Sequence, residues 1–239
     1  LRLKGLHCHI GSQIFEKEPF FAAADRMTDF AQKLQKELGV TLFEISFGGG
    51  FGINYTDKDA EIEPYAFVGE MIEALYCCCD EKGLPRYDFA IEPGRAIVGE
   101  AGITLYTVGT VKRVPGVRTF VSVDGGMGDN PRHILYGAEY TAKLANKPTA
   151  EATEVYAIAG RYCESGDMLI QQAHLPPCKA GDILAVFSTG AYHYSMASNY
   201  NRVPIPAMVL VNEGRHALIV QRQSYEQLIQ NDVMAPWQK

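Results

Sequence analysis

The sequence has no uninterrupted apolar run of the roughly 18 residues that a membrane-spanning helix needs, so we expect no membrane segment. It has no cluster of lysine and arginine, and a formal net charge of -6 argues against nonspecific nucleic-acid binding. Its first five residues lead straight into strand-like sequence and have no signal-peptide layout. With 47% hydrophobic and 21% charged residues, the 239-residue chain has the composition of an ordinary globular protein. Its acidic balance fits a cytoplasmic enzyme that acts on small molecules, and it fits many other proteins equally.

Cysteine occurs six times, but the chain has no secretory features, so we predict free thiols and not a disulfide framework. Cys77, Cys78 and Cys79 follow one another in a segment with a helical pattern. Consecutive residues on a helix point about 100° apart, so these three thiols cannot easily share one tetrahedral metal ion. His7 and His9 lie on the same side of a predicted strand and have no clear third ligand. We therefore predict no metal site.

Hydrophobic periodicity divides the chain near Glu100. Before that point, predicted strands at 3–10, 42–47 and 87–91 alternate with two predicted helices, 19–38 and 64–82. This order is typical of parallel βα units. Beyond it, turns rich in Gly, Pro and Asp separate short predicted strands at 104–114, 119–124, 154–159, 183–187, 206–210 and 217–221. We predict a βα domain at 1–100, which is part of a (β/α) barrel and which the resemblance described below assigns to cofactor binding, and a mostly antiparallel β domain at 101–239, with a boundary that strands could cross.

Residues able to do chemistry follow each of the three N-terminal strands. His9 and Ser12 follow the first, Gly48-Gly49-Gly50 the second, and Glu92 with Arg95 the third. In α/β barrels the active site forms at these C-terminal strand ends. Glycine amides can cradle a phosphate, to which Ser12 and Arg95 would add a hydroxyl and a guanidinium. The alternatives are plain tight turns and, because Glu92 follows a largely apolar strand, an internal ion pair between a buried Glu92 and Arg95.

Three further motifs lie in the second half of the chain. They are the glycine-rich segment 124–132 that leads into Tyr136, the run Cys163-Glu164-Ser165-Gly166-Asp167, and Gly190-Ala191-Tyr192. The first could equally be an interdomain loop with surface charges. The second places a thiol beside a carboxylate in a tight turn, which has chemical meaning only in company with other motifs.

The order and spacing of all these motifs, from about Leu3 to about Asn212, resemble the diaminopimelate decarboxylase family, whose members are pyridoxal-phosphate enzymes of the alanine racemase-like barrel type. The resemblance implies a fold of class α/β plus β, in which the C-terminal part of a (β/α)8 barrel precedes a mostly antiparallel β domain. It implies decarboxylation of meso-2,6-diaminopimelate to L-lysine and CO2, the last step of lysine biosynthesis. Because three βα units cannot close a barrel of eight, we expect this chain to be the C-terminal part of a longer protein.

The resemblance also implies roles for individual residues. His9 stacks on the cofactor ring, Glu92 faces its ring nitrogen, and Cys163 donates a proton to the carbon that loses CO2. The cofactor is contacted further by Ser12, Gly49, Gly50, Gly94, Arg95 and Tyr192. The substrate is bound by Arg95, Arg132, Tyr136, Glu164 and Tyr192. The family forms homodimers in which the segment matching Cys163 and Glu164 reaches into the partner's site.

Two features depart from the family pattern. Residues 140–146, Tyr-Thr-Ala-Lys-Leu-Ala-Asn, imitate the motif of the Schiff-base lysine, but they follow the barrel strands, and we predict a surface connection there. That lysine is then missing, so we expect this fragment alone to be inactive. His193-Tyr194 stands where family members commonly have Gly-Phe.

Two other functions stay open. One is a related barrel decarboxylase that acts on arginine, ornithine or carboxynorspermidine, and the other is a non-catalytic homologue that acts as a binding or regulatory partner. Arg132 and Glu164 favour diaminopimelate, because that substrate keeps a carboxylate that a guanidinium can hold.

Overall fold

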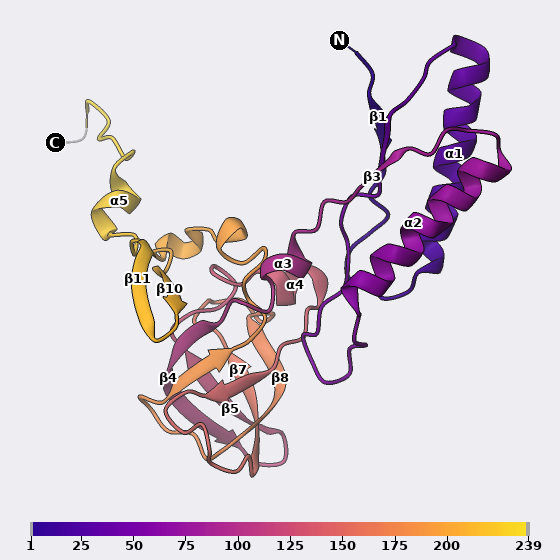
Figure 1. Cartoon of the computed structure of the whole chain (residues 1–239). Helices are drawn as coiled ribbons and strands as arrows, with labels where there is room; N and C mark the ends of the chain where they lie inside the picture. The colour runs from indigo at the N-terminus through magenta and orange to yellow at the C-terminus, as the bar shows by residue number, and fades with distance from the viewer. Residues whose placement is uncertain (1, 238–239) are drawn as a thin grey trace. The chain divides into compact units, whose positions relative to one another are not determined.

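The chain folds as two units, divided in sequence between Gly102 and Ile103, in a computed structural model that describes residues 2–237 (Figure 1). The first unit consists of strand–helix repeats, which are β1 (Gly5–His7), α1 (Glu18–Leu38), β2 (Glu44–Ser46), α2 (Pro64–Glu81), β3 (Asp88–Ala90) and α3 (Arg95–Val98). The strands form a parallel sheet in the order β1-β2-β3, with Leu6, Ile45 and Phe89 in register. The predicted parallel βα units are therefore present.

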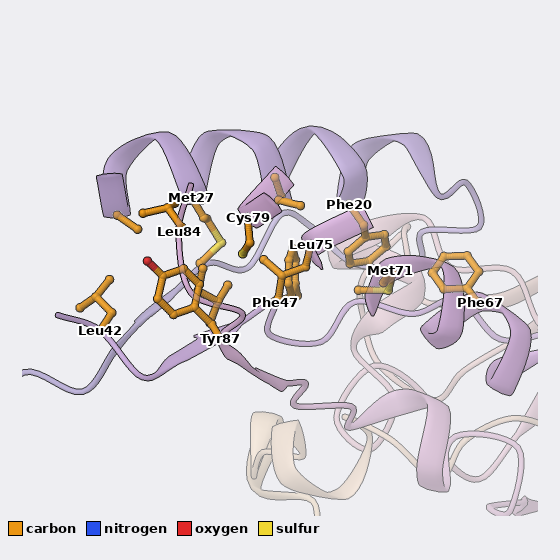
Figure 2. Packing of buried hydrophobic residues seen from close by; sticks show 14 of the residues in the cluster. Phe20, Met27, Leu42, Phe47, Phe67, Met71, Leu75, Cys79, Leu84 and Tyr87 are labelled. Carbon is orange, nitrogen blue, oxygen red and sulfur yellow. The ribbon is translucent and has the colours of Figure 1, made fainter. Parts of the chain in front are cut away.

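Helices α1 and α2 pack on each other and on one face of this sheet (Figure 2). Apolar residues recur along α1 at steps of three and four, which gives the helix one buried face. Large buried side chains of this core include Phe20, Met27, Ile45, Phe47, Phe67, Met71 and Leu75. Phe30 and Leu38, which the periodicity assigns to the same face, are more than half exposed, because Phe30 lies at its edge and Leu38 in the last turn.

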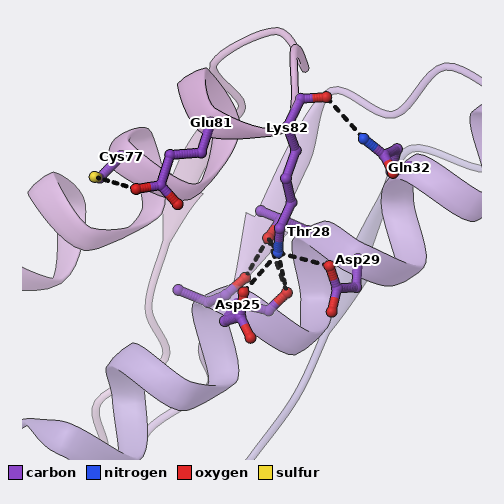
Figure 3. Close-up of polar contacts among 8 residues, drawn as sticks. Asp25, Thr28, Asp29, Gln32, Cys77, Glu81 and Lys82 are labelled. Carbon is purple, nitrogen blue, oxygen red and sulfur yellow. Dashed lines mark hydrogen bonds and ion pairs between the residues drawn. The ribbon is translucent and has the colours of Figure 1, made fainter.

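A lysine just beyond α2 fixes the two helices to each other (Figure 3). The Nζ of Lys82 lies 2.7 Å from a carboxylate oxygen of both Asp25 and Asp29. It also donates to Thr28 Oγ1 at 2.9 Å, and the Lys82 carbonyl accepts from Gln32 Nε2 at 2.8 Å. All four partners lie on two successive turns of α1, so this amine determines the height at which α2 ends against α1.

The consecutive cysteines of α2 point in different directions, as predicted, since Cys77 is exposed, Cys78 half-buried and Cys79 buried. Burial raises the pKa of the Cys78 and Cys79 thiols, and the neighbouring Glu81 carboxylate raises the pKa of Cys77. All six cysteines of the chain are free thiols. Within residues 2–237, no group of three or more His, Cys, Asp or Glu side chains is placed to hold a metal ion.

The second unit contains a six-stranded sheet in the order β6-β9-β4-β5-β7-β8. Neighbouring strands are antiparallel except β5 and β7, so the sheet is mostly antiparallel, as predicted. Its strands are β4 (Thr104–Val114), β5 (Arg118–Val123), β6 (Ala142–Leu144), β7 (Glu154–Ala159), β8 (Met168–Leu175) and β9 (Ile183–Val186). A separate hairpin of β10 (Met208–Asn212) and β11 (Arg215–Val220) precedes α5 (Tyr225–Ile229). No helix in the described part of the chain is long and apolar enough to cross a membrane.

The prediction of a surface connection at 140–146 is wrong. Residues Ala142–Leu144 form β6 and pair with β9, while Tyr140 and Leu144 are only 4% and 1% exposed. Alternate residues of an extended segment point to the same side, so these two side chains reach the core while Lys143 stays exposed. Strand β8 is also absent from the prediction, because irregular pairing with β7 interrupts the alternation of buried and exposed residues along it.

A buried carboxylate joins the turn before β9 to the segment that follows β6. Asp182 accepts hydrogen bonds from Lys147 Nζ at 2.7 Å, from Asn146 Nδ2 at 3.0 Å and from the Lys179 amide at 2.9 Å. Burial alone would raise the pKa of Asp182, but these donors outweigh it and lower the pKa to about 2. The carboxylate therefore stays ionised inside the unit and stabilises it.

Candidate active site

The sheet face away from α1 and α2 carries a polar cluster around Glu92. His7 ends β1, Ser46 ends β2, and Glu92 follows β3 by two residues, so all three side chains point to this face. Ser46 Oγ donates to Glu92 Oε1 at 2.6 Å, and His7 Nε2 lies 3.3 Å from the same oxygen. Both contacts end on Oε1, which leaves Oε2 for another donor.

The prediction that Glu92 is buried is wrong, because its side chain is 59% exposed. The helices cover only the opposite face of the sheet, so this face is open to water within the first unit. A solvated carboxylate needs no buried counter-ion, and the partners of Glu92 are Ser46 and His7 in place of Arg95. Ser46 carries no motif that sequence reasoning could have recognised.

The glycine loop after β2 is held against the loop after β1. His9 Nδ1 accepts from the Gly49 amide at 3.3 Å, and the Ile14 amide donates to the Gly50 carbonyl at 2.9 Å. A side chain at Gly50 would place its Cβ 2.2 Å from the Gly11 carbonyl oxygen, and the backbone has a φ of 99° there. Only glycine allows this approach, so the two strand-end loops form one rigid surface.

Arg95 brings a guanidinium to that surface. It is the first residue of α3, directly after Gly94, and its side chain is buried. Its Nη2 donates to Ser12 Oγ at 2.8 Å and its Nη1 to the Tyr55 hydroxyl. A guanidinium and two hydroxyls thus lie together beside the glycine loop, an arrangement suited to a phosphate group. Tyr55 was not predicted, because no local pattern links it to Arg95, which lies 40 positions away.

In the second unit, a buried arginine lies against two tyrosines. Arg132 begins α4 (Arg132–Tyr136), and its guanidinium carbon lies 5.0 Å from the ring centroid of Tyr136 and 5.7 Å from that of Tyr192. Arg132 Nε is buried and has no hydrogen-bond partner among the described residues. The two rings hold the guanidinium in place by cation–π contact, and Nε is left as a donor for an anion.

The loop with Cys163 and Glu164 is contacted by the short helix η2 (Tyr200–Arg202). Asn201 Nδ2 donates to Cys163 Sγ at 3.4 Å, and the Tyr200 hydroxyl donates to Glu164 Oε1. That hydrogen bond raises the pKa of Tyr200. Cys163 and Glu164 are both exposed, so a small molecule can reach them. Sequence reasoning missed both η2 residues, because nothing in the local sequence connects them to a loop almost 40 positions earlier.

Asp167 joins the loop of Arg132 to the loop of Cys163. Its buried carboxylate accepts from the Met127 amide at 2.8 Å and from the Tyr162 amide at 2.9 Å. His133 Nε2 lies 3.5 Å from the same carboxylate. Cβ atoms at Gly126 and Gly160 would come within 2.5 Å and 2.0 Å of it, so both glycines make room for this side chain.

His193, a departure from the family pattern, is buried beside Tyr192. Its Nδ1 lies 2.9 Å from the Ala191 carbonyl oxygen, and its Nε2 lies 3.0 Å from the Tyr140 hydroxyl. The ring of Tyr140 meets that of His193 edge to face, at a centroid distance of 5.4 Å. His193 therefore fills the space behind the loop that carries Tyr192.

The predicted site residues form two groups, one in each unit. The group in the first unit consists of His9, Ser12, Gly49, Gly50, Glu92, Gly94 and Arg95. The group in the second unit consists of Arg132, Tyr136, Cys163, Glu164 and Tyr192. The first group could hold a phosphate and an aromatic cation, and the second a carboxylate, an ammonium and a proton-accepting carbon.

Known proteins similar to this chain share both units. Residues 1–99 match the family model for the pyridoxal binding domain of pyridoxal-dependent decarboxylases. A diaminopimelate decarboxylase from Bacillus subtilis is 47% identical over 98% of this chain and 53% of its own length. One from Bacillus methanolicus is 49% identical over 92% of this chain and 51% of its own length. The chain thus spans about half the length of these curated relatives.

Solved structures agree. The diaminopimelate decarboxylase of M. jannaschii in complex with L-lysine has a TM-score of 0.89 at 34% identity, over 98% of this chain and 52% of its own. The Helicobacter pylori enzyme, also complexed with L-lysine, has a TM-score of 0.83 at 32% identity, over 96% of this chain and 54% of its own. These TM-scores show that the chain has the same fold as the matched half of both structures. The chain is therefore a relative of the diaminopimelate decarboxylases over nearly all of its length, and its first 99 residues match the pyridoxal binding domain of the pyridoxal-dependent decarboxylases.

Proposed function

We propose that the natural protein carrying this sequence uses pyridoxal phosphate to decarboxylate meso-2,6-diaminopimelate to L-lysine and CO2. The observation that carries this proposal is the 47% identity to the Bacillus subtilis enzyme over 98% of the chain. That similarity extends beyond the pyridoxal binding domain into the second unit, which contains Arg132, Cys163 and Glu164.

The residues of the first unit fit the cofactor. Ser12, Gly49, Gly50, Gly94 and Arg95 bind its phosphate, which the guanidinium and hydroxyls beside the glycine loop favour. His9 would contact its aromatic ring. Glu92 would accept a hydrogen bond from the protonated ring nitrogen on Oε2, while Ser46 and His7 contact Oε1. When bound, pyridoxal phosphate acts as the electron sink for the carbon that loses CO2.

The residues of the second unit act on the substrate. Arg132 binds the carboxylate that stays in the product, which is supported by its buried Nε, because that atom has no hydrogen-bond partner among the described residues. Glu164 binds the distal ammonium, and Tyr136 and Tyr192 flank Arg132, with Tyr192 also reaching the cofactor. Cys163 transfers its thiol proton to the carbon that CO2 has left.

The protein works as a homodimer in which Cys163 and Glu164 complete the site of the partner subunit. This part of the proposal rests on the family resemblance and on the exposure of the loop between β7 and β8, which a rigid sheet presents to its surroundings.

The test is to supply the natural protein and pyridoxal phosphate with meso-diaminopimelate and to measure lysine and CO2. We expect kcat/KM for meso-diaminopimelate to exceed that for ornithine, arginine or carboxynorspermidine by about 100-fold or more, because only this substrate satisfies Arg132. Cys163→Ala should lose most activity, while Cys77→Ser, at another exposed cysteine, should retain it. A preference for one of the other substrates would overturn the assignment.

A further inference from the structure

Two residues of η2 hold three consecutive residues of the Cys163 loop. The rings of Tyr162 and Tyr200 stack with centroids 5.7 Å apart and planes inclined by 26°. Asn201 Nδ2 donates to Cys163 Sγ at 3.4 Å, and the Tyr200 hydroxyl donates to Glu164. The thiol assigned to proton transfer and the carboxylate assigned to substrate binding thus each accept a hydrogen bond from a side chain of one short segment.

The backbone of this segment has an unusual conformation. Asn201 has a φ of 54° and Arg202 a φ of 57°, both in the left-handed region that residues other than glycine seldom adopt. The flanking residues secure it, because Asn199 Nδ2 donates to the Val203 carbonyl at 2.9 Å and Arg202 forms a two-pronged ion pair with Asp232 at 2.8 and 3.2 Å. Conformations of this kind persist only where surrounding contacts enforce them, and they cluster at functional sites. Here the result is that Asn201 is directed at the sulfur.

We propose that Asn201 and Tyr200 are positioning residues for the decarboxylation, Asn201 for the Cys163 thiol and Tyr200 for the Glu164 carboxylate. This inference rests on the proposed function. The amide N–H occupies one lone pair of Sγ, so the S–H bond is directed elsewhere, toward the substrate. Tyr200 holds one oxygen of Glu164 and leaves the other for the substrate ammonium.

The proton transfer is balanced as follows. The S–H bond of Cys163 breaks while a C–H bond forms at the carbon vacated by CO2, whose electron pair takes the proton. The thiolate that remains accepts the Asn201 N–H and is reprotonated by water. Asn201 therefore has a donor in place both before and after the transfer, which a residue that served only to pack the loop would not need.

Asn201→Asp is the decisive variant, because aspartate has the same shape, tolerates the left-handed backbone and replaces the donor by an acceptor. In the natural protein we expect kcat to fall about ten-fold while KM stays within about two-fold. Tyr200→Phe should instead raise KM about five-fold and leave kcat within about two-fold. Asn212→Asp and Tyr225→Phe, at exposed positions of the same unit, are the matched controls and should change neither constant.

Alkylation of Cys163 by iodoacetamide gives a readout independent of turnover. Followed by peptide mass spectrometry with exposed Cys77 as the internal reference, the reaction of Cys163 should slow about five-fold in Asn201→Asp, since a carboxylate beside the sulfur disfavours the thiolate. The inference would be overturned if the alkylation rate of Cys163 in Asn201→Asp were unchanged. It would also be overturned if kcat fell and KM rose by the same factor in this variant while its melting temperature was lowered. Failure of the wild type to decarboxylate diaminopimelate would instead refute the proposed function, and the alkylation result would still test the Asn201–Cys163 contact.

Discussion

Replacing Asp182 with asparagine removes one buried charge and tests how much it stabilises the second unit. Asparagine keeps the shape, but it puts an amide group near Lys147 and the Lys179 amide, which are themselves donors. Lowering the pKa from 3.8 to about 2 corresponds to roughly 2 kcal/mol of stability at neutral pH, since a shift of one pKa unit is worth about 1.4 kcal/mol. We therefore expect Asp182→Asn to lose at least that amount at pH 7.

The lowered pKa of Asp182 also predicts how the stability difference between wild type and Asp182→Asn changes with pH. A carboxyl group whose pKa is lowered by folding stabilises the protein above its unfolded pKa, and this stability is lost as the pH falls toward the folded pKa. About half of the contribution should be gone at pH 3, so the difference between wild type and Asp182→Asn should narrow by roughly 1 kcal/mol between pH 7 and pH 3. The asparagine cannot titrate, and the pH dependence that the other carboxyl groups contribute is the same in both proteins, so it cancels in the difference.

Urea unfolding of the natural protein and of the variant, followed by circular dichroism at several pH values, measures this difference. Asp80→Asn is the control, because it removes an ion pair with Arg86 in which both side chains are more than half exposed. That change should be far smaller, since exposed pairs contribute little. A stability difference that stays constant from pH 7 to pH 3 would show that the Asp182 charge is not what stabilises this turn.

Three further predictions concern the proposed site and the core. Glu92→Gln should still bind pyridoxal phosphate, as measured by absorbance titration, but its kcat should fall about 100-fold or more, because a neutral amide cannot keep the ring nitrogen protonated. Near-normal turnover in this variant would show that Glu92 does not have this role. Mixing inactive Glu92→Gln with inactive Cys163→Ala should restore up to about a quarter of wild-type activity if subunits share sites, because half of the dimers are then mixed and each has one intact site. No recovery after confirmed subunit exchange would show that Cys163 acts in the site of its own chain. Leu75→Ala should lower the free energy of unfolding by about 3 kcal/mol, measured in urea, and a loss below about 1 kcal/mol would contradict the tight packing of the first core.

The elements that could be predicted are those with local signals. Helices α1 and α2 have an apolar periodicity over many turns, and each begins with a proline at one of its first positions. Strands β4 and β7 match their predicted bounds, Thr104–Val114 and Glu154–Ala159, because turn residues surround them. In the site, the proximity of Ser12 to Arg95 follows from the parallel order of the strands, since both residues come after strand ends.

The features that escaped prediction depend on contacts distant in sequence. The approach of Asn201 to Cys163 spans 38 positions and requires a backbone conformation that no local motif indicates. The exposure of Glu92 depends on which sheet face the helices cover, and the apolar run before Glu92 does not carry that information. The position of residues 140–146 after the barrel strands predicted a surface connection, whereas the alternation of Tyr140 and Leu144 with other residues is what places these two side chains in the core.

The carboxylate of Asp167 has a consequence for how this protein can vary. This one side chain accepts hydrogen bonds from backbone amides in the loops of both Arg132 and Cys163. A shift of either loop therefore displaces the other, and the two loops cannot adjust to a new substrate independently. Gly126 and Gly160 leave no space for a Cβ atom beside it. In a library of random substitutions, active variants should therefore retain Asp167, Gly126 and Gly160 together. Altered substrate preference should arise first at Tyr136 or Tyr192, because their exposed rings can be replaced without moving the Asp167 carboxylate.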